Sequence, residues 1–513
     1  MPIFEVRHSD LAARIGRIET PHGTFETPAF VPVVHPVKQT VSTTFLKKLG
    51  FECVITNAYI TLRHYGDEAR SRGIHDIIGY DGSVMTDSGG YQVLEYGSVE
   101  VDPETMALFE RDIRSDIPIP LDKPTGYGLD HSKASEYVET TLANCRKTLD
   151  AVSPRSEGKD GAIWIGPVQG AEHSDLVERS AKALDQMGFS FLALGSPVEV
   201  MEAYEFAVLA RMIATAKRSL SRGKPIHLFG AGHPLTISLA VALGCDTFDS
   251  ASYMLYAREG RYMLPNGTAR IDDLSYLPCP CPVCNSYKAA ELRGLPNDER
   301  TVEIAKHNLS VLKAEVDAVK QAIMDGRLWE YCMVKARAHP KLMEAVRLFQ
   351  DFEFLAEGTA LFKDKAVFLY EPIDQHRPEV RRFREAVARC AARGKKKLVL
   401  CPEGELHPFY STRIYAQLRR AYPDGQICSY SPFLGIIPAE ISDVYPAAHN
   451  VAARSQYSAS DFPTFADSLA RYLDSNGFEE IVIAAERDDF LKQSIDLVLA
   501  SRDNRIKVSQ HER

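Results

Sequence analysis

The sequence predicts an α/β protein that begins with a (β/α)8 TIM-type barrel and ends in a smaller α/β accessory domain. Eight short apolar runs, rich in β-branched residues, alternate with helical stretches over about the first 250 residues. A cysteine cluster with metal-ligand spacing follows the eighth run, and a second set of strands comes later. We therefore expect a first domain over residues 1–330, with an inserted metal-binding subdomain at 271–330, and a second domain over 331–513.

The eight apolar runs are predicted to be the barrel strands. Helical stretches separate most of them, as in the segments 135–151, 175–187, 198–216 and 235–243. No glycine-rich dinucleotide fingerprint follows the first run, which favours a closed barrel over an open doubly wound sheet. The predicted strands lie near Ala29–Val33, Cys53–Thr56, Ser83–Thr86, Ile117–Leu121, Ala162–Val168, Phe191–Leu194, Pro225–Phe229 and Asp246–Phe248.

Polar residues stand directly after these predicted strands. Barrel active sites lie at the carboxyl ends of the strands, because those ends converge at one mouth. A single Asp at such a place is commonly a helix cap or a turn residue, but six polar strand ends on one rim indicate a functional site. They are Asp87 after the third strand, Asp122 after the fourth, Gln169 and Gly170 after the fifth, Gly195 and Ser196 after the sixth, residues 230–233 after the seventh and Asp249 at the eighth.

This group of residues suits chemistry at a sugar–base bond. Two carboxylates beside a sugar carbon can act as nucleophile and as general acid and then base. A carboxylate and an amide together can read the edge of a purine, and glycines let the backbone approach a flat ligand. The sequence therefore indicates cleavage of an N-glycosidic bond with recognition of a purine. Five histidines are isolated in the sequence, and we expect each to be structural or to lie next to the substrate. They are His64, His131, His173, His227 and His233.

Three cysteines and a histidine form the sharpest motif of the chain. Cys279, Cys281 and Cys284 are followed, after 22 further residues, by His307. Three thiolates and one imidazole complete a tetrahedral Zn²⁺ shell with no open position, so one structural zinc per chain is expected. His307 is predicted to lie early in a helix from Val302 to Asp325, with the preceding Thr301 as its cap. The alternative is a chance cluster of buried cysteines.

Composition and charge are those of an ordinary globular protein. Hydrophobic residues make up 45% of the chain, and no apolar stretch is long enough to span a membrane, so we expect a cytoplasmic location. The net charge of −9 argues against a general nucleic-acid binder. One basic run can be read as a solvated helix face or as a phosphate-contacting surface. Its members are Arg377, Arg381, Arg382, Arg384, Arg389, Arg393, Lys395, Lys396 and Lys397.

At these motifs the chain resembles the tRNA-guanine transglycosylases over roughly residues 1–330. The segments Asp87–Gln92, Val168–Gly170 and Phe248–Ser250 and the cysteine–histidine quartet stand in the family's order and spacing. The stretch from Ser250 to Met263 is similar to the archaeal branch, whereas queuine-type members carry a cysteine-containing turn there. The archaeal branch replaces guanine at position 15 of the tRNA D-loop with 7-cyano-7-deazaguanine, the first step of archaeosine biosynthesis on tRNA.

The resemblance implies a double displacement on tRNA and a role for particular residues. Asp249 would attack the ribose and form a covalent intermediate, and Asp87 would act as general acid and then as general base. No redox cofactor or ATP is implied, because one glycosidic bond is exchanged for another. The base would be held by Asp122, Gln169 and the Gly195 backbone, with Tyr91 or a neighbouring aromatic stacking on it and Ser88 and Gln92 in or behind the pocket.

Residues 335–500 resemble an accessory domain of archaeal transglycosylases that also occurs in archaeosine synthase. The likeness lies in segments 431–438 and 445–449. The synthase carries an essential lysine in a motif whose counterpart here is 401–410, where His407 stands in the lysine's place, so we expect a positioning role. Full-length archaeal enzymes continue into a PUA-type RNA-binding domain, for which the sequence leaves no room. We therefore expect a separately encoded PUA-type partner, with the alternative that the basic segment 377–397 is sufficient. Because members of the family commonly form homodimers, we also expect a homodimer.

Three alternatives stay open at this point. Queuine-type exchange at the anticodon would use the same chemistry, but the archaeal-like stretch 250–263 and the accessory domain speak against it. A non-catalytic tRNA-binding subunit is opposed by the presence of both Asp87 and Asp249. A zinc-dependent hydrolase is disfavoured because four protein ligands leave no position for a water.

Overall fold

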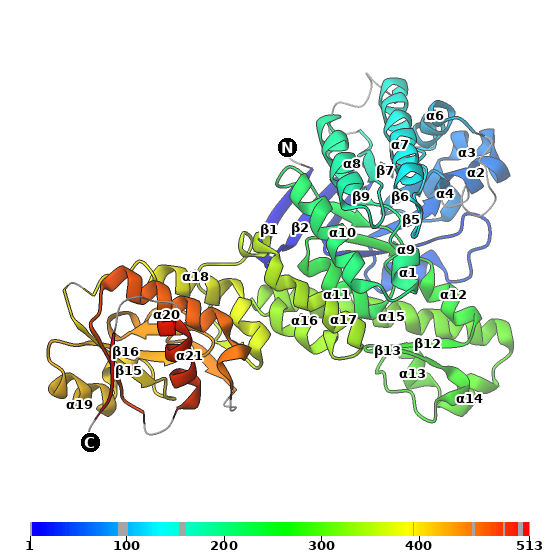
Figure 1. The fold of residues 1–513 in the computed structure, drawn as a ribbon. Helices are drawn as coiled ribbons and strands as arrows, with labels where there is room; N and C mark the ends of the chain where they lie inside the picture. The colour runs from blue at the N-terminus through cyan, green and yellow to red at the C-terminus, as the bar shows by residue number, and fades with distance from the viewer. Residues whose placement is uncertain are drawn as a thin grey trace. The chain divides into compact units, whose positions relative to one another are not determined.

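The structure, a computed structural model, describes residues 3–90, 101–152, 161–392, 394–453, 457–485, 488–500 and 506–511. Two compact units divide the chain after Leu348, one formed by residues 1–348 and the other by residues 349–513. Each unit has its own sheets (Figure 1). Among the helices described, none combines the length and the apolar character needed to cross a membrane.

Eight parallel strands form the centre of the first unit, and all lie where the sequence predicted them. One sheet has the order β4–β11–β10–β9–β8 and another the order β5–β6–β7, and a bridge between Val33 and Ile55 joins β4 to β5. Just before β8, Ile163 N donates to the carbonyl oxygen of Asp116, just before β7, at 2.8 Å. This order is consistent with a TIM-type fold. The strands are β4 (Ala29–Pro32), β5 (Cys53–Asn57), β6 (Ser83–Asp87), β7 (Ile117–Pro118), β8 (Ile165–Val168), β9 (Phe191–Leu194), β10 (Ile226–Leu228) and β11 (Thr247–Ser250).

Helices follow most of these strands, as alternating βα units require. The predicted helix 198–216 is divided, because Tyr204 has φ of +58° and a left-handed residue interrupts a right-handed helix. The other predicted helices of the region match α7, α8 and α11 to within a few residues. The helices are α1 (Thr43–Lys48), α2 (Ala58–Tyr65), α3 (Asp67–Arg72), α4 (Ile74–Ile78), α6 (Pro103–Asp112), α7 (His131–Val152), α8 (Ser174–Gln186), α9 (Val198–Glu202), α10 (Phe206–Ser219), α11 (Pro234–Ala242) and α12 (Ser252–Arg258).

An antiparallel sheet that the sequence analysis missed covers the amino-terminal ends of the parallel strands. Its side chains Phe4, Ile18 and Phe25 share one buried cluster with residues at the strand starts, such as Ile117 and Ile165. Apolar packing therefore seals this end, and the polar strand ends lie on the opposite side. The sheet consists of β1 (Phe4–Asp10), β2 (Ala13–Thr20) and β3 (Gly23–Thr27).

A small lobe with the cysteine quartet follows the eighth strand. Its long helix α15 runs from Asn297 to Met324 and begins earlier than the predicted start at Val302. Thr301, predicted as the cap, is instead buried within the helix, because Pro296 holds the cap position and acidic side chains follow it in the first turn. Figure 1 draws the lobe in green beside α15, with β12 (Arg261–Leu264), β13 (Gly267–Arg270), α13 (Pro282–Ser286) and α14 (Ala289–Gly294).

Two short helices complete the first unit, where the sequence predicted one helical segment from Trp329 to Phe354. They are α16 (Leu328–Ala336) and α17 (Pro340–Arg347). Pro340 begins a new helix because proline has no N–H to donate to a preceding turn. The side chain of His339 caps α17 by accepting from Lys341 N at 3.2 Å.

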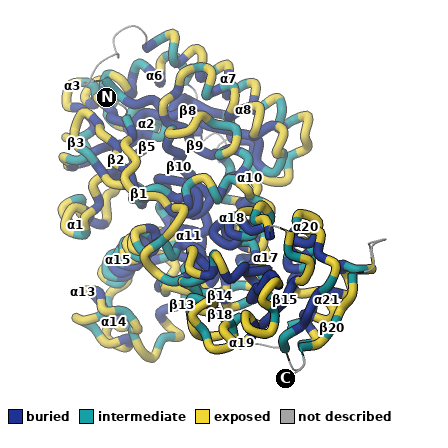
Figure 2. Tube along the Cα trace, turned by 90° about the vertical axis from the view of Figure 1, so that its left-hand side faces the viewer, coloured by how far each residue is buried: buried dark blue, intermediate teal, exposed yellow. Residues whose placement is uncertain are grey.

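The second unit is built on a five-stranded sheet of order β17–β16–β15–β19–β20, in which β17 runs antiparallel to β16. Leu398 and Leu400 of β15 pack with α18, α20 and α21, while Val399 and Cys401 pack with α19 on the other face. Buried residues, dark blue in Figure 2, make up the centre of β15. The sequence predicted β14, β15, β16 and β19 and missed β17, β18 and β20. The elements are β14 (Val367–Leu369), α18 (Pro378–Val387), β15 (Lys397–Pro402), α19 (Arg413–Ala421), β16 (Gln426–Ser431), β17 (Gly435–Pro438), β18 (Asn450–Ala452), α20 (Pro463–Asn476), β19 (Glu480–Ile483), α21 (Asp489–Ala500) and β20 (Lys507–Gln510).

The basic run at 377–397 is not a single helix face, because it passes from α18 into β15. Arg377 is fully buried, and Arg382 donates to the carbonyl oxygens of Thr359 and Ala360 at 2.7 and 3.0 Å. Arg377 and Arg382 of the run thus serve the packing of this unit, which weakens the reading of the whole run as a phosphate-contacting surface. Three of its lysines pair with acids: Lys395 with Glu440, Lys396 with Glu479 and Lys397 with Glu480.

Candidate active site and metal centre

Asp249 lies near the carboxyl end of β11, where the sequence placed it. Its Oδ1 accepts two hydrogen bonds at 3.0 Å, one from Nε2 of His227 on β10 and one from the backbone N–H of Gly230. Within the described residues, no hydrogen bond reaches Oδ2. One oxygen of the carboxylate is therefore held by the protein, and the other is available to a ligand.

Asp87 ends strand β6, which β4 and β5 separate from β11, and its carboxylate accepts from Asn57 and Gly89. Asn57, at the end of β5, donates from Nδ2 to Oδ2 at 2.9 Å, and the Gly89 N–H donates to Oδ1 at 3.1 Å. Asn57 Oδ1 also accepts from Ile60 N at 2.8 Å and so caps α2. Because the cap fixes which end of the Asn57 amide faces the helix, the N–H end must face Asp87.

Two carboxyls of the candidate site, Asp87 and Asp122, have pKa values raised toward neutral pH. Burial raises the pKa of Asp87 to about 6, and the charge of Asp249 adds to the shift, whereas hydrogen bonds from Gly89 and Asn57 oppose it. Burial also raises the pKa of Asp122 to about 7, with the charge of Asp87 adding to it. A carboxyl group that exchanges its proton near neutral pH is suited to act as an acid in one step and a base in the next.

Asp122 and Gln169 lie together, as the sequence predicted for the base pocket. Gln169 Nε2 donates to Asp122 Oδ2 at 2.6 Å, while its Oε1 accepts from Thr125 N at 3.1 Å and Ser196 Oγ at 2.9 Å. These partners determine the orientation of the amide. A Cβ on Gly195 would lie 2.2 Å from Gln169 Nε2, so only glycine allows this approach. The sequence-predicted Asp122, Gln169 and Gly195 therefore form one group.

Ser88, directly after Asp87, is fully buried, and its Oγ has no hydrogen-bond partner among the described residues. A buried hydroxyl without a partner costs about 1–3 kcal/mol, so a polar ligand beside it would recover free energy. The position of Ser88 therefore agrees with a place in the pocket. Tyr91 and Gln92, which the sequence analysis also assigned to the pocket, lie outside the described residues.

Three residues that the sequence analysis did not select hold the candidate site in place. They are His227 beside Asp249, Asn57 beside Asp87, and Thr125 beside Gln169. His227 looked isolated because its partner lies 22 positions away, and the contact forms only once β10 and β11 pair. The sequence offered one signal for this contact: His227 lies in a predicted strand, and the next predicted strand along the chain ends at Asp249.

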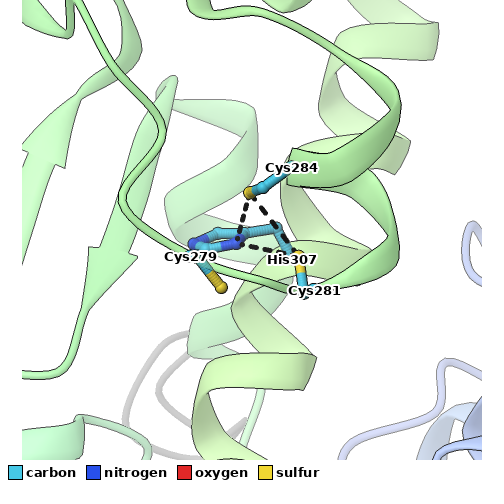
Figure 3. A group of neighbouring side chains, drawn as sticks. All are labelled: Cys279, Cys281, Cys284 and His307. Atoms are coloured by element: carbon cyan, nitrogen blue, oxygen red, sulfur yellow. Dashed lines mark hydrogen bonds between the residues drawn. The ribbon is translucent and has the colours of Figure 1, made fainter.

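The four predicted metal ligands come together, with their ligand atoms within 4.8 Å of one another (Figure 3). Nδ1 of His307 lies 3.4 Å from Sγ of both Cys281 and Cys284, and these sulfurs are 3.5 Å apart. Ligands of a tetrahedral zinc are separated by roughly 3.5 Å, given bonds of about 2.0–2.3 Å. The Nε2 of His307 donates to the carbonyl oxygen of Met263 at 2.8 Å, which orients the ring. The cluster, completed by Cys279, can hold a metal ion and is compatible with zinc.

A second group with metal-ligand chemistry, His22, His75 and Asp116, lies at the opposite end of the strands. Oδ1 of Asp116 accepts from the backbone N and Nδ1 of His22, at 3.1 and 2.8 Å. Its Oδ2 accepts from His75 Nε2 at 3.0 Å and from Val84 N at 2.8 Å. Since each carboxylate oxygen already accepts two hydrogen bonds, this geometry is explained without an ion.

Comparison with known proteins agrees with these observations. A family model described as "Queuine tRNA-ribosyltransferase" matches residues 9–341, and one described as a "Domain of unknown function (DUF5591)" matches residues 380–512. The chain is 43% identical over 455 residues to a tRNA-guanine(15) transglycosylase of Aeropyrum pernix, covering 87% of this chain and 86% of the relative. It is 39% identical over 447 residues to the Sulfolobus acidocaldarius protein of the same name, covering 86% and 87%.

A third relative, from Methanosarcina mazei and also named tRNA-guanine(15) transglycosylase, is 38% identical over 492 residues. That match covers 95% of this chain and 94% of the relative, so it includes both units. The first family model alone matches more than half of the chain. The chain therefore belongs to the tRNA-guanine transglycosylase family and is an enzyme of the pentosyltransferase class.

Proposed function

We propose that this enzyme replaces guanine at position 15 of the tRNA D-loop with 7-cyano-7-deazaguanine, as the first step of archaeosine biosynthesis on tRNA. The names of its relatives support the tRNA substrate and the position. The observation that carries the proposal is the pair of carboxylates, Asp249 and Asp87, at the carboxyl ends of two parallel strands, β11 and β6. Asp249 has one oxygen held and one available, and Asp87 has a pKa raised to about 6, to which the charge of Asp249 contributes.

In the proposed first step, Oδ2 of Asp249 forms a bond to the ribose C1′. The bond from C1′ to the base breaks, and its electron pair leaves with guanine. Neutral Asp87 gives its proton to the departing base and becomes a carboxylate. The tRNA is then held as an ester of Asp249, whose Oδ1 is the carbonyl oxygen and keeps the hydrogen bonds from His227 and Gly230.

In the second step, the incoming 7-cyano-7-deazaguanine attacks C1′ and displaces Asp249. Asp87 takes the N9 proton of the incoming base and so returns to its neutral form. The number of protons and glycosidic bonds is unchanged after both steps, so the exchange needs no redox cofactor. A base inside a tRNA fold must leave its stack to reach the strand ends, so extrusion of the target nucleotide is part of the proposal.

The base pocket is assigned to Asp122, Gln169 and the Gly195 backbone, with Ser88, Tyr91 and Gln92 around it. Asp122 and the amide of Gln169 offer acceptors and a donor to the edge of a purine-like base. Gly195 supports this because its lack of a side chain brings the backbone close to the Gln169 amide. In this assignment the base meets groups that are already held in place by hydrogen bonds.

We assign the cysteine–histidine quartet to one structural Zn²⁺ per chain. Cys279, Cys281 and Cys284 would supply thiolates, and His307 would supply Nδ1, which faces the sulfurs while Nε2 is occupied by Met263 O. Zinc there would join the loop at residues 279–284 to α15 and supply no chemistry to the strand ends. By the same family resemblance we propose a closed barrel, a homodimer and a cytoplasmic location.

Base exchange on full-length tRNA transcripts tests the proposed function. The transcript carries labelled guanine at position 15, 7-cyano-7-deazaguanine is supplied, and release of the label is followed. Release by the wild type, with a loss on the order of 10³-fold in Asp249→Asn, is the expected result. A transcript with adenine at position 15 is the matched substrate control. Absence of release from the wild type would contradict the proposal, as would equal release by Asp249→Asn.

A further inference from the structure

His227 lies between two polar residues of the next strand and contacts both through its ring nitrogens. Nε2 is 3.0 Å from Asp249 Oδ1, and Nδ1 is 2.8 Å from Thr247 Oγ1. The His227 side chain is fully buried. The strand pairing produces this arrangement: His227 of β10 is in register with Thr247 of β11, and side chains two apart on a strand share a face. One ring therefore reaches both Thr247 and Asp249.

The partners define the tautomer of the ring. A carboxylate only accepts hydrogen bonds, so Nε2 must carry the proton that it donates to Asp249. In a neutral ring Nδ1 is then an acceptor, and the hydroxyl of buried Thr247 can donate to it. Thr247 thus holds His227 in the form that presents an N–H to Asp249, much as a backbone partner fixes the tautomer of a metal-binding histidine.

The hydrogen bonds to Asp249 are asymmetric in a way that bears on its reactivity. Both described donors, His227 and Gly230, bind Oδ1. This holds Oδ1 in place and leaves Oδ2 as the oxygen available to the ribose in the proposed reaction. When the ester breaks in the second step, negative charge returns to the carboxylate, and two fixed N–H donors receive it without reorganisation.

We propose that His227 is a positioning residue for the nucleophile, locked by Thr247, which selects Oδ2 of Asp249 as the oxygen that bonds to C1′. It acts through Asp249, since both ring nitrogens are occupied by protein groups and the ring is buried away from solvent. A role in proton transfer to the base is assigned to Asp87 instead. This inference rests on the proposed function, because it concerns the rate at which the Asp249 ester forms and breaks.

Two amide variants separate positioning from packing. In His227→Gln the side-chain Nε2 stands where the imidazole Nε2 stood and can still donate to Asp249. In His227→Asn the shorter amide reaches only the place of Nδ1, beside Thr247. Both remove the ring and both put an amide in the same buried place, so their melting temperatures should be similar. We expect single-turnover guanine release to fall about 10–100-fold in His227→Asn and clearly less in His227→Gln.

The KM for tRNA should stay within about threefold of the wild-type value in both variants, because His227 is assigned no contact with substrate. Thr247→Val keeps the shape of the side chain but removes the hydroxyl, and an intermediate loss of rate is expected. His75→Leu is the control, since it removes a histidine–carboxylate contact of the same 3.0 Å length at the other end of the strands. It should leave guanine release per folded enzyme unchanged.

Equal rates in His227→Gln and His227→Asn would overturn the inference, whether both match the wild type or both are equally slow. A fall in release with His75→Leu as large as with His227→Asn would overturn it too, because a general loss of packing would then explain both. The proposed function is judged separately on the wild type. If the wild type releases no guanine, the proposed function is wrong. If the wild type releases guanine normally and the two His227 variants release it at equal rates, only the positioning role of His227 is wrong.

Discussion

Asn57 donates from Nδ2 to Asp87 Oδ2 at 2.9 Å while its Oδ1 accepts from the first turn of α2. One amide thus joins a helix start to a candidate catalytic carboxyl. The two contacts use opposite ends of the same group, so the helix cap fixes the donor that Asp87 receives. The proton affinity of Asp87 therefore depends on a residue of the preceding strand.

Asn57→Ala should reduce both stability and activity. Loss of the cap should lower the free energy of unfolding by about 1 kcal/mol, and loss of the donor should further raise the pKa of Asp87. We expect the pH profile of guanine release to move to higher pH. Ser42→Ala is the matched control, because Ser42 caps α1 through Phe45 N at 3.2 Å and contacts neither carboxyl. A pH profile that does not move in Asn57→Ala would contradict this account.

Asp87 and Asp122 should make the protein less stable as pH rises. Their folded pKa values of about 6 and about 7 lie above the unfolded value near 3.8, so the folded state binds the protons more tightly. Stability from this source is complete below about pH 4 and is lost as pH rises through 6 and 7.

Asp122→Asn should therefore raise the melting temperature at pH 8 and have little effect near pH 4. The full shift of Asp122 corresponds to about 4 kcal/mol, and the loss of its ionic hydrogen bond to Gln169 will offset part of that. Asp87→Asn should follow the same trend with a smaller gain, since the pKa of Asp87 is raised to about 6 and that of Asp122 to about 7. Melting curves at the two pH values provide the measurement, and a gain that is larger at pH 4 would refute the assignment.

Removal of the metal should unfold the lobe rather than stop the chemistry directly. Chelation, or Cys284→Ser, should lower the melting temperature and release about one zinc per chain, because the proposed ion would join the 279–284 loop to α15. Cys390→Ser removes a partly buried cysteine outside the quartet and serves as the control. Activity should fall in proportion to the loss of folded protein. Full activity in metal-free, folded enzyme would show that the cluster needs no ion.

Gly195→Ala should weaken binding of the incoming base. Its Cβ would lie 2.2 Å from Gln169 Nε2, and the amide, held by Asp122 and Ser196, would have to move. We expect the KM for 7-cyano-7-deazaguanine to rise about tenfold or more, with a smaller change for tRNA. Gly294→Ala, whose Cβ meets nothing within 4 Å, should leave both constants unchanged. An unaltered KM for the base in Gly195→Ala would remove Gly195 from the pocket.

The elements that could be predicted from the sequence are those marked by a pattern of residues close together in the chain. Short apolar runs marked all eight parallel strands, and cysteine spacing marked the quartet at 279–307. The β1–β3 sheet was missed because its residues alternate with many charges and its role is to cover strands far along the chain. The basic run carried no signal of its contacts, because Arg377 donates to the carbonyl oxygen of Phe368 and Arg382 to that of Thr359, and both contacts form only in the fold.

The same limit applies to the candidate site. Asp87, Asp122, Gln169 and Asp249 could be selected because each follows a recognisable strand. Residues that hold them, such as His227, act across a strand pairing and carry no spacing signal. Sequence pattern therefore indicates the reacting groups, while their hydrogen-bond partners require the fold.

The most direct test of the account is to map the covalent bond between enzyme and tRNA. Wild-type enzyme is incubated with the tRNA transcript without an incoming base, denatured and digested, and the ribose-bearing peptide is identified by mass spectrometry. The account predicts a ribosyl ester on Asp249 that disappears when 7-cyano-7-deazaguanine is added before denaturation. An adduct on another residue, or guanine exchange without any adduct, would contradict the central claim that Asp249 is the nucleophile.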